Sequence, residues 1–149
     1  MQLDYFKLEK YQDYNIEHRS VLTILDNDTA AKNYLGDLFL ITKKTQIANE
    51  DNGIDTFYIA YRGNTPIGFC AINMIDYKPF ISYGILPEFR GSHLGYLLVN
   101  DFSEHLLKEY NFDNVFANVN QKNISSIKSV ELAGYKKMSL TRYVLPNYY

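Results

Sequence analysis

A chain of 149 residues with a formal net charge of −2 is long enough to bury a core and has the size of one domain. Apolar residues make up 46% and charged residues 21%, which excludes the composition of a disordered chain. Fifteen Lys and Arg are scattered among seventeen Asp and Glu, and this excludes the basic stripe typical of proteins that bind nucleic acid. We therefore predict one domain spanning residues 1–149, with no nucleic acid as partner.

Location is predicted from the N-terminus and from the cysteine content. The segment Met1–Tyr5 lacks the charged-then-apolar layout of a signal peptide, and no run approaches the ~20 apolar residues of a membrane helix. The single cysteine, Cys70, excludes an intrachain disulfide and is expected in the core. These features predict a cytoplasmic protein without a membrane partner.

Periodicity predicts a first strand followed by a broken helical region. Leu3–Leu8 alternates apolar and polar residues, as a half-buried strand does. The pattern from Gln12 to about Asn49 is helical, with a helix start at Asp28-Thr29 and an interruption at Gly36. The segment Asn49–Gly53 is expected to form a polar turn.

Three strands follow, and then the hydrophobic period changes to that of a helix. The strands are expected at Thr56–Tyr61, Ile67–Met74 and Phe80–Leu86. A helix is expected from Gly91 to about Lys108. The chain should end with a strand at Val115–Val119, a helix at Asn123–Ala133 and a strand at Tyr143–Leu145. This order predicts an α/β (α+β) fold with a mixed, largely antiparallel sheet flanked by helices.

The segment Ile85–Tyr96 is the part of the sequence that indicates chemistry. A strand ends, a loop follows, and a helix opens with Gly91 and Gly95. Free N–H groups and the positive dipole end at a helix start stabilise phosphate, and Arg90 adds a positive charge at the rim. The same joint occurs where glycines serve only packing, so the pattern alone leaves both interpretations open. Neither a Walker A loop nor a Gly-x-Gly-x-x-Gly fingerprint is present.

The segment Pro87–Gly95 resembles the acetyl-CoA signature of the GCN5-related N-acetyltransferases (GNAT), Arg/Gln-x-x-Gly-x-Gly/Ala. The resemblance continues through Asn123-x-x-Ser126 and Ala133-Gly134-Tyr135 and covers Thr56 to Tyr135, while Asp26–Leu38 is similar to the ribosomal-protein N-terminal acetyltransferase branch. It implies a GNAT-like acyltransferase domain with acetyl-CoA as co-substrate. The implied reaction is direct attack of an amine on acetyl-CoA in a ternary complex. The acceptor would be a small-molecule amine or a protein N-terminus, and a homodimer is common among relatives.

The resemblance also implies residue roles. Backbone groups of Ile85 and Leu86 would pair with the pantetheine arm, Asn123 would hydrogen-bond to it, and Ser126 would lie near the sulfur as the catalytic residue. The remaining cofactor-binding residues would hold the pyrophosphate or line its rim: Arg90, Gly91, Ser92, His93, Leu94, Gly95 and Tyr96.

Three positions depart from the family pattern. His93 replaces the first glycine of the signature, Val130 replaces the tyrosine that serves many members as acid, and Met138 replaces a glutamate of the ribosomal branch. Ser126 is the substitute expected for the missing acid. The missing tyrosine also favours an alternative, an acyl-CoA-binding module with little or no catalysis. A third interpretation is an interaction domain whose glycines only serve packing.

Other polar residues are expected to have no role in the chemistry. Three His and one Cys show no zinc-like spacing, so no metal is expected. His18, His105 and Asp101 are expected at the surface. On the strand before the signature, either Ser82 or Tyr83 should face the substrate, and the sequence leaves that choice open.

Overall fold

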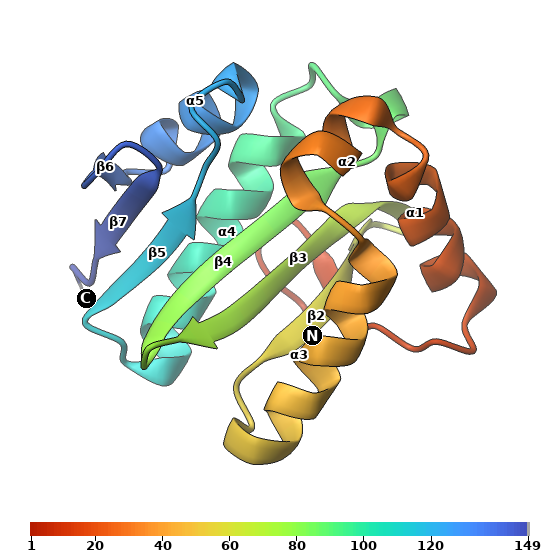
Figure 1. The fold of residues 1–149 in the computed structure, drawn as a ribbon, viewed down its shortest axis with the longest axis horizontal. Helices are drawn as coiled ribbons and strands as arrows, with labels where there is room; N and C mark the ends of the chain where they lie inside the picture. Colours follow the sequence, from red (N-terminus) through yellow and green to blue (C-terminus); the bar gives the residue numbers. More distant parts are fainter. Residues whose placement is uncertain (149) are drawn as a thin grey trace.

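The computed structural model describes residues 1–148, which form a seven-stranded sheet with helices on both faces (Figure 1). The strand order is β1-β2-β3-β4-β5-β7-β6, in which β4 and β5 pair parallel and every other pair is antiparallel. The strands are β1 (Lys7–Lys10), β2 (Thr56–Arg62), β3 (Thr65–Ile75), β4 (Lys78–Ile85), β5 (Asn114–Asn118), β6 (Lys136–Lys137) and β7 (Arg142–Pro146). The predicted mixed, largely antiparallel sheet flanked by helices is confirmed.

Two groups of helices cover the two faces of the sheet. The helices are α1 (Ile16–Asp26), α2 (Thr29–Leu35), α3 (Leu38–Asn52), α4 (Leu94–Tyr110) and α5 (Ile124–Leu132), with a 3-10 turn at Pro87–Phe89. On one face α4 packs against β4, β5 and α5, around Leu98, Phe102 and Val115. On the other face α1 packs on β3 and α3 on β2, around Leu22 and Phe69. In Figure 1, α1–α3 lie over β2–β4, whereas β5 and β7 lie beside them.

The predicted helical region divides into three helices that each begin at a capping side chain. Asn15, Asp28 and Asp37 each accept a backbone N–H from the first turn of the helix that follows. The predicted helix start at Asp28 is confirmed. Gly36 ends α2 with a φ of 81°, so the predicted interruption at this position is confirmed as well.

The first strand begins later than predicted because the chain turns between Leu3 and Phe6. The Leu3 N–H donates to the Phe6 carbonyl at 2.7 Å. The buried carboxylate of Asp101, on α4, accepts the N–H groups of Asp4 and Tyr5 at 3.2 and 2.9 Å. Those backbone groups are therefore satisfied outside the sheet, and the predicted strand is wrong over its first four residues. The expectation that Asp101 is solvated is also wrong.

The predicted turn at Asn49–Gly53 is wrong, because α3 continues to Asn52 and ends at Gly53, with a φ of 70°. The Asn52 side chain donates to the Asp55 carboxylate at 2.9 Å and accepts the Asp55 N–H at 3.0 Å. The Asn52 side chain therefore forms hydrogen bonds with the buried Asp55 instead of taking part in a turn. The two-residue strand β6 was too short to be detected by periodicity.

The β3–β4 hairpin turns at Asp76 and Tyr77, whose φ angles of 51° and 63° suit the two-residue turn that matches strand twist. β4 begins two residues earlier than predicted and includes Pro79. The Leu86 N–H donates to the Ile67 carbonyl, so even-numbered residues of β4 pair with β3 and the nitrogen of Pro79 faces away from it. The missing N–H therefore costs no bond of this ladder.

We expect Gly68→Ala to lower the free energy of unfolding by about 3 kcal/mol, because the added methyl would overpack two backbones. A Cβ at Gly68 would lie 2.0 Å from the Gly84 carbonyl oxygen, which has no side-chain freedom to move. Gly53→Ala is the control, because a Cβ at Gly53 would have no atom within 4 Å. This variant should lose only about 1 kcal/mol, the cost of placing alanine at a φ of 70°. Urea unfolding measures both variants. If both variants lost the same free energy of unfolding, the close contact between Gly68 and the Gly84 carbonyl would be contradicted.

Candidate functional site

The parallel strands β4 and β5 pair at only two positions, Phe80 with Phe116 and Ile81 with Ala117. Beyond these positions β4 continues to Ile85 without a partner on its β5 side, and Figure 1 shows the two strands diverging. A cavity of about 410 Å³ opens beside this end of β4 and is lined by residues of α2, β4, the loop before α4, the start of α4, and α5. Its volume lies within the range of small-molecule sites.

The start of α4 faces this cavity with unpaired backbone donors. α4 begins at Leu94, three residues after the predicted start, because Gly91 and His93 have φ angles of 82° and 61° that an α-helix excludes. Each of the other four described α-helices has a capping side chain, and α4 has none. Four N–H groups donate no hydrogen bond to any of residues 1–148, those of His93, Leu94, Gly95 and Tyr96. This row of donors can bind an anion.

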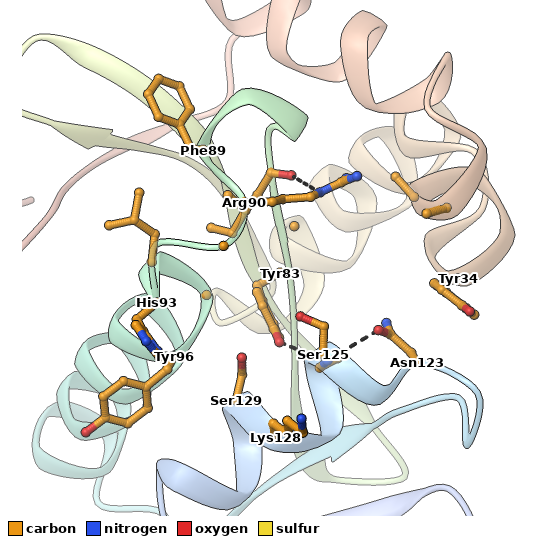
Figure 2. A pocket seen from close by; sticks show the side chains of 18 of the residues that line it. Tyr34, Tyr83, Phe89, Arg90, His93, Tyr96, Asn123, Ser125, Lys128 and Ser129 are labelled. Carbon is orange, nitrogen blue, oxygen red and sulfur yellow. Dashed lines mark hydrogen bonds between the residues drawn. The ribbon is translucent and has the colours of Figure 1, made fainter.

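Arg90 ties the loop before α4 to two other elements (Figure 2). Its Nε donates to the Ile85 carbonyl at 3.1 Å, and a terminal nitrogen lies 2.9 Å from the Asp28 carboxylate at the start of α2. Hydrogen bonding to this guanidinium holds the pKa of the Asp28 carboxyl below its usual range. The charge of Arg90 is thus partly compensated, and α2 is fixed against the rim of the cavity.

The two β4 residues predicted to pair with a pantetheine arm differ in their free backbone groups. Leu86 donates its N–H to the Ile67 carbonyl and accepts the N–H of Phe89, so both of its backbone groups are used. The Ile85 carbonyl accepts from Arg90. By the alternation along β4, the Ile85 N–H points to the side of the strand where β5 has diverged. Of these two residues, the structure leaves only the Ile85 N–H free for a ligand.

The first turn of α5 brings Asn123 and Ser126 to the cavity. The Asn123 carbonyl oxygen accepts the Ser126 N–H at 3.3 Å and caps the helix, while its NH₂ group has no partner among the described residues. The Ser126 hydroxyl lies 2.9 Å from the Tyr83 hydroxyl. Tyr83 lines the cavity and Ser82 does not, which answers the choice that the sequence leaves open.

Tyr83 on β4 is one of the two residues expected to face the substrate, and the sequence assigned it no role in the chemistry. Its hydroxyl reaches Ser126 across the cavity and also interacts with Ser129 (Figure 2). Burial raises the pKa of the Tyr83 phenol, so the group stays protonated across the neutral range. Val130 is fully buried in the core. A phenol therefore enters this cavity from β4, whereas the helical position expected for a tyrosine packs inward.

The described lining of the cavity has cationic groups and no carboxylate. Arg90 and Lys128 line it together with His93, whose exposed side chain lies at the start of α4. Leu86 and Ser92 do not line it, and the Ser92 hydroxyl donates to the Phe89 carbonyl. This charge pattern suits an anionic ligand. Among residues 1–148, no three His, Cys, Asp or Glu side chains group as metal ligands would, and no helix is both long and apolar enough to cross a membrane.

Two other residues lie outside the cavity. His18 is buried, so its expected surface position is wrong: its ring accepts the Gln12 N–H at 3.0 Å and contacts the Glu9 carboxylate at 3.0 Å. The hydrogen bond with this ring lowers the pKa of the Glu9 carboxyl. Cys70 is fully buried, as predicted, and burial raises the pKa of its thiol.

The Acetyltransferase (GNAT) family model matches residues 26–135. The chain is similar in structure to spermidine N-acetyltransferase from Vibrio cholerae in complex with CoA and spermine, with a TM-score of 0.75, 13% identity and 96% of each chain covered. It is also similar to aminoglycoside acetyltransferase AAC(6')-Ib in complex with coenzyme A and kanamycin, with a TM-score of 0.73, 18% identity, and 95% and 94% covered. At these identities the likeness to solved structures shows the fold alone. No curated protein matches the chain.

We expect Gly95→Ala to weaken coenzyme A binding at least ~10-fold while holding or raising the free energy of unfolding. Alanine favours a helix by roughly 0.5–1 kcal/mol over glycine. The added Cβ would meet the Ser129 hydroxyl at 3.4 Å and the Tyr83 ring at 3.5 Å, which are ordinary contacts, but it would occupy space at the cavity. Calorimetry and urea unfolding measure the two effects. Exposed Glu109, at the far end of α4, supplies the control Glu109→Ala; unchanged affinity in Gly95→Ala would contradict the assignment.

Proposed function

Because the chain belongs to the Acetyltransferase (GNAT) family, whose members are acetyl-CoA-dependent N-acetyltransferases, we propose that the cavity beside β4 carries out acetyl transfer to an amine. The observation that carries this proposal is the uncapped start of α4, where four N–H groups have no partner among the described residues and open on a cavity whose described lining has no carboxylate. Such a site stabilises a diphosphate.

The residues present fit coenzyme A as a substrate. The N–H groups of His93–Tyr96 would hold the pyrophosphate, with Gly91 allowing the turn that aims them and Arg90 fixing the rim. The free Ile85 N–H and the Asn123 NH₂ group would hydrogen-bond to the pantetheine arm. The structures of the Vibrio cholerae spermidine enzyme and of AAC(6')-Ib, both complexes with coenzyme A, support the choice of cofactor.

Tyr83 and Ser126 would supply the acid. In the reaction the amine nitrogen attacks the thioester carbon, the C–S bond breaks, and the thiolate takes up a proton. A protonated Tyr83 hydroxyl, held 2.9 Å from Ser126, is suited to donate that proton, and Ser126 would orient it. The amine loses its own proton to water, since no carboxylate is in the described lining.

A small-molecule amine is the proposed acceptor. Two of the similar structures hold amines of this kind, spermine and kanamycin. A protein N-terminus as acceptor, a homodimer and a cytoplasmic location stay predictions from the sequence. The function as a whole is tested by incubating the purified protein with acetyl-CoA and a panel of amines while following release of free thiol. No amine-dependent release would overturn it.

We expect Tyr83→Phe to lower kcat by roughly 10²–10³-fold, because general acid catalysis contributes about that factor. Ser126→Ala should lower kcat about tenfold, since one hydrogen bond that orients the phenol is lost. Neither variant should change coenzyme A affinity by more than about twofold, because neither hydroxyl holds the phosphates. Thiol-release kinetics and calorimetry provide the two readouts.

Tyr77→Phe and Ser20→Ala are the matched controls, since both side chains are exposed and lie outside the cavity. They should leave kcat and affinity unchanged. If Tyr83→Phe retains full kcat, Tyr83 is not the acid; if Ser126→Ala alone retains it, Ser126 has no part in the proton transfer.

A further inference from the structure

A second hollow adjoins the cavity, and Tyr34 of α2 lines both. Its other walls come from Asn118 at the end of β5, Asn120 just after it, Ser139 in the β6–β7 turn and Arg142 at the start of β7. The Tyr34 hydroxyl donates to the Lys122 carbonyl at 3.5 Å, so Tyr34 bridges from α2 to the loop before α5. Figure 2 shows Tyr34 below α2, on the same side of the cavity as Asn123. A molecule in this hollow would therefore lie next to one in the cavity.

Among the described residues that line the hollow, one carries a charge, Arg142. Its Cζ lies 5.0 Å from the centre of the Phe80 ring, which stacks on Phe116 at 5.3 Å. Phe80 and Phe116 are paired across β4 and β5, one position before Ile81 and Ala117, the last pair before the strands diverge. Stacking occupies the flat face of a guanidinium and leaves its N–H edge free.

Within residues 1–148, no carboxylate forms an ion pair with this guanidinium. Among residues 1–148, the side chain of Arg142 has no ion pair and no hydrogen bond, whereas Arg90 pairs with Asp28 and Arg19 with Asp13. The described lining of the hollow consists otherwise of Tyr, Asn, Val, Ser and Thr side chains. A site for a polycation needs carboxylates, and a stacked, unpaired guanidinium instead fits a carboxylate or phosphate, which it binds through two parallel hydrogen bonds.

This inference rests on the proposed acetyl transfer. We propose that the hollow is the acceptor site. The acceptor is an amine that also carries a carboxylate or phosphate group, which Arg142 binds. The amine end reaches past Tyr34 toward the cavity, and the anionic end stays with the guanidinium. Polyamines and aminoglycosides, which carry only positive charge, are then poor substrates.

The test is thiol release from acetyl-CoA with pairs of acceptors that share a scaffold and differ in one anionic group. The carboxylate arm compares the twenty amino acids with their carboxamides, and the phosphate arm compares glucosamine 6-phosphate with glucosamine. Spermidine and kanamycin are the cationic acceptors. We expect an anionic acceptor to exceed its neutral match at least tenfold in kcat/KM, and the arm in which this occurs identifies the anion.

Arg142→Gln links the preference to the residue. It should lower kcat/KM for the anionic acceptor at least tenfold through KM, leave its neutral match within about twofold, and leave coenzyme A affinity unchanged. Arg142→Lys should recover part of the loss, which keeps the test valid if removing the guanidinium from Phe80 weakens folding. Lys137→Gln is the control, since Lys137 is an exposed cation on the neighbouring strand β6 and lies outside the hollow.

Each outcome decides the matter. A preference for spermidine or kanamycin, equal loss for charged and neutral acceptors in Arg142→Gln, or no activity with any anionic amine overturns this inference. If thiol release with a cationic amine remains, the proposed acetyl transfer still stands. If no amine releases thiol at all, the proposed function fails together with the inference.

Discussion

The start of α4 is the constraint on which the site depends. A helix of 17 residues begins without a capping side chain, although a cap is worth about 1 kcal/mol and four other helices of the described chain have one. His93 adds further cost, because it takes a left-handed conformation that an L-residue adopts at roughly 1–2 kcal/mol. Both costs leave N–H groups unpaired at the cavity. The packing of α4 on β4 and α5 holds this strained start in place.

Much of the fold was predictable from local sequence, because β2 and β3 are short runs rich in apolar, β-branched and aromatic residues and helices α4 and α5 repeat apolar residues at the helical period. The predicted element bounds are wrong where a side chain distant in sequence, or one beyond the helix end, binds the backbone or the last residue of the helix. Asp101 binds the backbone of Asp4 and Tyr5, 96 or more positions away, and moves the start of β1. Asp55 recruits the Asn52 side chain and lengthens α3 through a segment with the composition of a turn. A single-sequence pattern contains no sign of either partner.

The candidate site was predictable where the chemistry is local. The loop and helix start at Gly91–Tyr96 and the cap at Asn123 are short motifs, and the structure brings them to one cavity. Tyr83 was predicted only as one of two candidates with Ser82, and its pairing with Ser126 was not predictable, because Ser126 is 43 positions away and joins it only when β4 and α5 face the same space. The pairing of Arg90 with Asp28 has the same origin. Divergence of β4 from β5 creates that space, and no residue of either strand signals it.

The charges around the cavity and the adjoining hollow affect how the acceptor amine becomes a nucleophile. An ammonium cannot attack a thioester, so the amine must lose a proton before the reaction. A carboxylate near the amine would stabilise its charged form and raise its pKa, whereas cationic surroundings lower it. The described linings contain Arg90, Lys128 and Arg142 and no Asp or Glu. The proposed acceptor site would therefore favour the neutral, reactive amine by its electrostatics, and a methionine at position 138 in place of a glutamate is consistent with chemistry that needs no dedicated carboxylate base.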